Sequence, residues 1–172
     1  MAIIVESDMR FGEFDEERLF VIEHSDVYKK AGKGIKTVEF IYLTENDNLL
    51  FIEAKQSCPN EANKDETEEK QIKYEEYFSD ITDKFVDSLN MFAASALGRN
   101  HECYNAGAVL KEKNTYENIG LKLILVINNA EDSWLQGPKI ELEQRLLRFR
   151  KIWRADILVL NKKMAKEYGL IS

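Results

Sequence analysis

The chain has 172 residues, of which 44% are hydrophobic and 32% charged, and its formal net charge is −7. At this length we expect one domain, spanning residues 1–172, with enough apolar side chains to bury a substantial core. The negative charge argues against a protein that grips nucleic acid by itself through many phosphates, because such proteins are usually basic. No apolar run approaches the ~20 residues of a membrane span, so we expect no membrane partner.

The N-terminal segment and the cysteines indicate a cytoplasmic protein. The segment MAIIVESDMRF carries acids where a signal peptide needs a positive stretch followed by a long apolar one. Cys58 and Cys103 lack metal-type spacing, so we expect free thiols in a reducing compartment, with a disulfide as the alternative. His24 and His101 are too few and too far apart to indicate a zinc site or a proton relay.

The first elements are expected to be short. Residues 1–17 show no clean period and are expected to be irregular. Residues 18–25 (RLFVIEHS) predict a first strand, on which Glu23 is either a solvent-facing acid or a third acid for a site. Residues 25–32 predict a short helix with a serine cap and a glycine at its end.

Residues 37–57 carry the strongest pattern in the chain. The apolar runs TVEFIYL and LLFIEAKQS flank the polar stretch TENDN, which predicts a β-hairpin. With the turn centred on Asn46, Glu39 lies directly across from Glu53, and Lys55 shares their face because strand side chains alternate. Opposed carboxylates repel, and half-buried charges are costly unless they are paired or bound to metal. This face is therefore a candidate site for a divalent cation with a lysine beside it.

A polar, acidic loop and a long helix follow the hairpin. The loop, residues 58–69, is either a passive surface segment or a lid over the site. Residues 68–99 predict an amphipathic helix that packs across the sheet, because apolar side chains recur at steps of three and four: Phe78, Ile81, Phe85, Leu89, Phe92 and Ala96. On its flank, Lys84 and Ser88 are i, i+4 neighbours. Lys84 either extends along the helix surface into solvent or brings a second cation to the site.

The last third of the chain predicts alternating helices and strands. Residues 100–120 are expected to form a loop, with a short helix or edge strand at AGAVLKE. Two apolar runs predict buried strands, 121–129 and 155–161, and the second leads into a short helix. Residues 140–153 predict an amphipathic helix with a basic cluster, which either faces solvent and pairs with acids or meets a phosphate backbone: Arg145, Arg148, Arg150, Lys151 and Arg154. This order predicts an α/β fold with a single mixed β-sheet flanked by helices.

The residues Glu39, Glu53, Ala54 and Lys55 resemble the core of the PD-(D/E)XK nuclease-like superfamily, which has the restriction-endonuclease fold. In that superfamily an acid on one strand and an acid-x-Lys on the next hold Mg²⁺ and activate water. The resemblance implies Mg²⁺ or Mn²⁺ on Glu39 and Glu53, with Lys55 as a catalytic residue. The fourteen-residue separation of the two acids fits the pattern, whereas no proline precedes Glu39 and the first acid is Glu where Asp is usual.

The same resemblance adds further candidates around this core. The helix after the acid-x-Lys strand often lines the active site, which makes Lys84 a candidate catalytic residue and Ser88 a candidate substrate contact. Gln56 and Ser57 follow Lys55 and are expected to orient substrate. A long first helix, which commonly adds another acid in the superfamily, is not predicted here.

Two functions follow, from different classes. The first is a metal-dependent nuclease, acting most simply on DNA. The second is a non-catalytic module on the same fold, which binds a protein partner or regulates one, with Glu53 and Lys55 as a structural ion pair. No Gly-rich phosphate loop, nucleophile elbow or metal-ligand motif supports a different α/β enzyme. The oligomeric state is left open.

Overall fold

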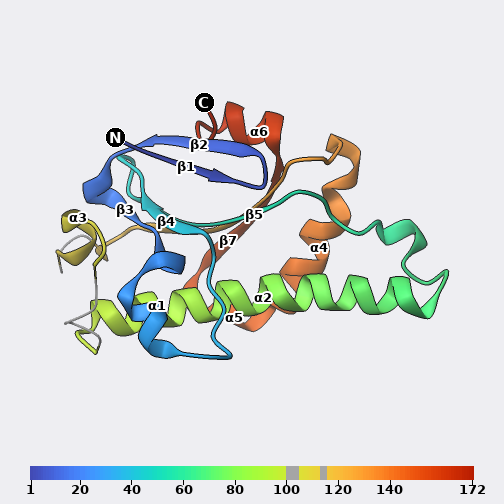
Figure 1. Cartoon of the computed structure of the whole chain (residues 1–172), viewed down its shortest axis with the longest axis horizontal. Coiled ribbons are helices and arrows are strands. Elements are labelled where there is room, and N and C mark those ends of the chain that lie inside the picture. The colour runs from blue at the N-terminus through green and yellow to red at the C-terminus, as the bar shows by residue number, and fades with distance from the viewer. Residues whose placement is uncertain (100–104, 113–115) are drawn as a thin grey trace.

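The computed structural model describes residues 1–99, 105–112 and 116–172, and a mixed β-sheet lies at its centre (Figure 1). The predictions for His101 and Cys103 fall outside these residues. The five strands of this sheet lie in the order in which they follow one another in the chain: β3 (Leu19–Phe20), β4 (Phe40–Leu43), β5 (Asn48–Lys55), β6 (Gly120–Ile127) and β7 (Ala155–Asn161). Strands β3 to β5 are antiparallel, whereas β5, β6 and β7 run parallel. The predicted mixed α/β architecture is confirmed.

The hairpin of β4 and β5 has the register expected from its turn. Ile41 pairs with Phe51 and Leu43 with Leu49, and Phe40 lies opposite Ile52. One further step of the same register sets Glu39, directly before β4, opposite Glu53. Side-chain alternation then gives Glu39, Glu53 and Lys55 the same face of the sheet.

The expectation for residues 1–17 was wrong, and so was that of a single sheet. Strands β1 (Ala2–Glu6) and β2 (Met9–Phe14) form a separate two-stranded antiparallel sheet. Its turn residues, Ser7 and Asp8, both have positive φ, 49° and 58°, as in the two-residue turns whose twist suits a hairpin. Neither is glycine or asparagine, so the usual signal for such a turn is absent from the sequence. Phe11 and Phe14 pack their rings on Phe40 and join the small sheet to the large one.

The strand expected over residues 18–25 is only two residues long. It gives way to a 3₁₀ turn (Ile22–His24) and then to helix α1 (Asp26–Ala31), which ends at Gly32 as predicted. The hydroxyl of Ser25 donates to the carbonyl of Ile22 at 2.6 Å and accepts the N–H of Tyr28 at 3.1 Å. This buried hydroxyl joins the 3₁₀ turn to the helix, so the chain leaves the sheet early and Glu23 lies in the turn.

Helices cover one face of the sheet, and the small sheet with helix α6 (Lys162–Glu167) covers the other (Figure 1). Helix α2 (Glu68–Ala96) begins where predicted, with Thr67 as its cap, and ends just before Gly98, three residues short of the predicted Arg99. Its apolar side chains are buried against β5 and β6. A short helix, α3 (Ala108–Lys111), occupies part of the segment where a helix or edge strand was expected.

The helix expected over residues 140–153 is two helices. Helix α4 (Gln136–Arg145) ends at Leu146, whose φ of −94° and ψ of 12° leave the helical region, and α5 (Leu147–Trp153) begins directly after it. Leu146 is buried, and both helices contact β7. The apolar stripe continues through the break, so sequence periodicity does not reveal it. None of the helices described has the length and apolarity needed to cross a membrane.

Candidate metal centre

The expected site lies where β5 ends, on the face of the sheet that α2 covers. Glu53 and Lys55 share this face with Phe51, which packs against the helix. The turn between β1 and β2 lies beside this end of the sheet, because the side-chain amide of Asn128, after β6, donates to the carbonyl of Ser7 at 2.9 Å. The small sheet thereby brings Glu6 to the ends of the central strands.

Glu53 is a completely buried carboxylate. Its Oε1 lies 2.8 Å from Nζ of Lys84 and 3.1 Å from Nζ of Lys55. Its Oε2 is buried and has no hydrogen-bond partner among the described residues. Burial raises the pKa of Glu53, and the two ammonium groups act in the opposite direction. Two ammonium groups therefore contact Oε1 of Glu53. Its Oε2 has no partner in the described part of the chain, which is costly in a protein interior.

Lys84 joins the two carboxylates that the hairpin opposes. Its Nζ is 2.8 Å from Oε1 of Glu53 and 3.8 Å from Oε1 of Glu39. Burial lowers the pKa of Lys84, but the two carboxylates outweigh that effect and hold it above its usual value. Of the two alternatives for this lysine, an inward position beside the acids is the one observed.

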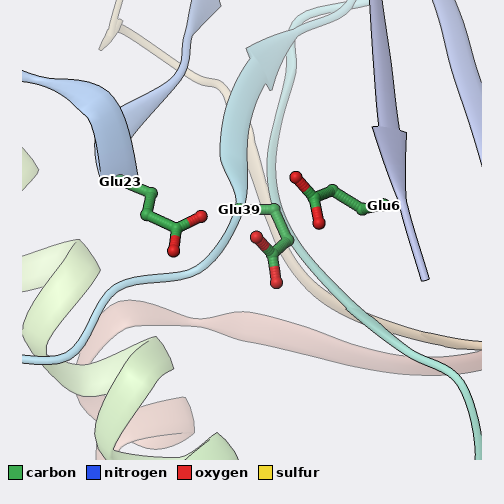
Figure 2. Close-up of side chains that lie close together, drawn as sticks. All are labelled: Glu6, Glu23 and Glu39. Atoms are coloured by element: carbon green, nitrogen blue, oxygen red, sulfur yellow. The ribbon is translucent and has the colours of Figure 1, made fainter.

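Glu6, Glu23 and Glu39 form a cluster of three carboxylates that point toward one another (Figure 2). They come from the end of β1, from the 3₁₀ turn and from the residue before β4, and one oxygen of each lies within 4.8 Å of the others. Burial raises the pKa of Glu39 to about 8, with further contributions from Glu53 and from a hydrogen bond with Glu23. Burial and Glu23 also raise the pKa of Glu6. The three carboxylates of this cluster have more negative charge than the neighbouring lysine, Lys84, can neutralise.

The cluster fits a hard divalent cation. Such cations prefer carboxylate oxygens, at about 2.0–2.1 Å for Mg²⁺ and about 2.3–2.6 Å for Ca²⁺, so oxygens on opposite sides of the ion lie about 4–5 Å apart. The three carboxylate oxygens, which all lie within 4.8 Å of one another, are close enough to share one ion. Glu6, Glu23 and Glu39 are therefore the residues that would hold a metal. Glu53, the other expected metal ligand, is not one of the three and pairs with Lys55 and Lys84, although its Oε2 has no hydrogen-bond partner among the described residues.

Lys55 is the more exposed of the two lysines. Its Nζ lies 3.1 Å from Glu53 and 3.3 Å from Oδ2 of Asp80 on α2. Although burial acts to raise it, the pKa of Asp80 is lowered by Lys55 and by Lys36, which lies 3.3 Å away. Sequence reasoning missed Asp80; its position four residues before Lys84 on the same helix was the available signal.

The remaining candidates lie around this centre rather than in it. The hydroxyl of Ser88 is buried and accepts the backbone N–H of Val38 at 2.8 Å, so it fixes the segment that carries Glu39. Gln56 and Ser57 are exposed directly after β5, and Gln56 accepts a hydrogen bond from Asn128 at 3.3 Å. Substrate contacts by these three residues stay a prediction. Cys58 is a free thiol, as expected, and burial raises its pKa to about 11.

The acids and lysines of this centre come from five separate segments of the chain: β1, the 3₁₀ turn, the residue before β4, β5 and α2. Comparison with family models, with curated proteins and with solved structures gives no match for this chain.

Proposed function

We propose that this protein is a metal-dependent nuclease of the PD-(D/E)XK type, which hydrolyses phosphodiester bonds, most simply those of DNA. The connectivity supports a restriction-endonuclease-like fold: three antiparallel strands, β3 to β5, are followed by helix α2 and by the parallel strand β6. The resembled core has the same sequence of elements.

The observation that carries the proposal is the convergence of acids and amines at the end of β5. Three carboxylates lie within 4.8 Å of one another, and Lys84 links Glu39 among them to Glu53. A cation bound at such acids supplies a water of lowered pKa and neutralises charge on a phosphate. Lys84 holds Glu53 and Glu39 in position, and the more exposed amine of Lys55 stabilises negative charge that develops on the substrate.

The test is cleavage of labelled DNA in the presence of Mg²⁺ or Mn²⁺. Glu39→Gln keeps the size of the side chain and removes a carboxylate oxygen, so cleavage is expected to fall by about a hundredfold or more. Glu68→Gln is the matched control, because Glu68 is exposed in the first turn of α2, and it should cleave as the unmodified protein does. An unmodified protein that cleaves neither DNA nor RNA, or a Glu39→Gln variant of full activity, would refute the proposal.

A second candidate is the non-catalytic binding module on the same scaffold. It is favoured by one specific feature: both lysines contact the same oxygen of the fully buried Glu53, as a structural ion-pair network would. Calorimetric titration with Mn²⁺ separates the two candidates. Heat of binding that disappears in Glu23→Gln supports the metal centre, and absence of binding at millimolar Mn²⁺ supports the module.

A further inference from the structure

Helix α5 borders a cationic cleft at the opposite end of the sheet from the candidate metal centre. The cleft has a volume of about 290 Å³ and is lined by Leu147, Arg150, Lys151, Arg154, Ala155 and Asp156; we refer to it as the α5 cleft.

The α5 cleft and the metal centre are separate sites. Strand register aligns Lys55 with Ile127 and Ile127 with Asn161, six residues beyond Ala155. At ~3.3 Å per residue, the cleft lies about 20 Å from the level of Lys55 along the sheet, and two strands away.

The cations of the α5 cleft are poorly neutralised, unlike Arg145 of the same basic cluster. Arg145 is held by Glu141 at 2.6 Å and by Glu75 at 2.7 Å. Arg150, by contrast, contacts the carboxylate of Glu143 only at 3.9 Å. Lys151 and Arg154 make no ion pair within 4.0 Å in the part of the chain that the structure describes.

The one acid that lines the α5 cleft does little to offset this charge. Asp156 alternates with Ile157 along β7, so its side chain belongs to the sheet face of Leu158 and Leu160, which is covered by α6 and the small sheet. Helix α5 packs on the opposite face, where Phe149 contacts the core that contains Ile157.

Arg150 also has a donor without an acceptor. Its Nε is buried and has no hydrogen-bond partner among the described residues. A buried N–H without a partner is unfavourable, and a guanidinium presents its donors in a planar fork that matches phosphate oxygens. Because Arg150 lines the α5 cleft, an anion with several oxygens there meets its guanidinium group.

The exposed apolar residues of α5 do not form a surface for a membrane. Leu147, Ile152 and Trp153 are 46%, 77% and 39% exposed, but their positions lie about 100–140° apart around the helix axis. A helix that lies on a lipid surface needs one continuous apolar face opposite its charges.

We propose that the α5 cleft binds the phosphate backbone of a nucleic acid through Arg150, Lys151 and Arg154. The choice of nucleic acid among phosphate-bearing polymers rests on the proposed nuclease function; the binding itself needs neither metal nor cleavage. The α5 cleft gives this acidic protein, with a net charge of −7, a local basic surface that holds a polyanion.

The test measures binding of a fluorescently labelled DNA duplex by anisotropy, at low salt with divalent cations chelated. The α5 variant combines Arg150→Gln, Lys151→Gln and Arg154→Gln. The matched control combines Lys162→Gln, Lys163→Gln and Lys166→Gln on α6, which are also exposed. Each variant removes three positive charges, so the two have the same net charge.

The α5 variant is expected to bind DNA roughly tenfold or more weakly, and its slope of log affinity against log salt should be shallower by about 2–3. The α6 control should stay within about twofold of the unmodified protein. The single variant Lys151→Glu, at an exposed helical position, should weaken binding in the same direction if the triple variant proves unstable.

Three results would overturn this assignment. They are equal weakening by the α5 and α6 variants, absence of DNA binding by the unmodified protein, and tighter α5-dependent binding to phosphatidylserine vesicles or to poly-glutamate than to DNA. Cleavage assays keep the two proposals apart. A protein that binds DNA through α5 and cleaves nothing contradicts the nuclease function alone. Full cleavage with unchanged binding by the α5 variant contradicts the cleft alone.

Discussion

Glu39 has a pKa well above that of an ordinary surface glutamate. Burial, the facing carboxylate of Glu53 and the hydrogen bond with Glu23 raise its pKa from 4.5 to about 8. Lys84 offsets this only in part, because its Nζ lies closer to Glu53, at 2.8 Å, than to Glu39, at 3.8 Å. Lys84 therefore neutralises Glu53 more than it neutralises Glu39, and the pKa of Glu39 stays raised.

Glu39→Gln should stabilise the protein in alkaline solution. The folded pKa exceeds the unfolded value, so the folded state binds the proton more tightly. The stability that this group contributes is present below pH 4.5 and is lost as the pH rises through about 8. In urea unfolding, the variant should match the unmodified protein near pH 5 and exceed its free energy of unfolding by at least about 1 kcal/mol above pH 8.

Glu68→Gln is the control for this measurement, since Glu68 is exposed at the start of α2 and its variant should show no such pH-dependent gain. A Glu39→Gln protein that is less stable than the unmodified one above pH 8 contradicts the proposed charge state.

At the scale of elements, the sequence predicted the structure best where the pattern of apolar residues and the turn signal indicate the same element. The alternation of apolar residues in 37–57 and the polar turn predicted the register that places Glu39 opposite Glu53. The aromatic stripe of α2 predicted the helix that carries Lys84. Glu6 escaped prediction because β1 and β2 pair through a turn without glycine. The short β3 escaped it because the buried Ser25 hydroxyl bonds the 3₁₀ turn and α1 together, a contact that alternation of apolar residues cannot reveal.

The turn between β1 and β2 should accept the sequence Asn-Gly with a gain in stability. Ser7 and Asp8 both adopt positive φ, which costs non-glycine residues free energy that Asn and Gly largely avoid. The double variant Ser7→Asn, Asp8→Gly should raise the free energy of unfolding by about 0.5–1 kcal/mol, measured by denaturant titration. The variant Asp8→Val should lower the free energy of unfolding, because a β-branched residue is strained at positive φ. A double variant less stable than the unmodified protein would count against this account of the turn.

At the scale of the whole molecule, charge is divided between two ends of the sheet. The acids that would hold a metal gather at the carboxyl end of β5, whereas unneutralised cations gather beside the start of β7. Net charge and sequence order conceal this division, because Glu6, Glu23 and Glu39 come together only when the small sheet packs on the large one. The candidate metal centre and the α5 cleft therefore lie apart in the fold, and a variant of one should leave the other intact.

Metal binding should join the small sheet to the large one and stabilise the whole chain. The three carboxylates come from β1, the 3₁₀ turn and the residue before β4, so a cation that they share links three separate segments of the chain. Mn²⁺ at about a hundred times its dissociation constant adds about 2.7 kcal/mol to folding, which for this size raises the thermal midpoint by roughly 5–10 °C. The rise should be larger near pH 8 than near pH 6, because Glu39 must release its proton before it binds metal. Glu23→Gln should abolish the rise and Glu68→Gln should preserve it; an equal rise in both variants would show that Mn²⁺ acts elsewhere on the protein.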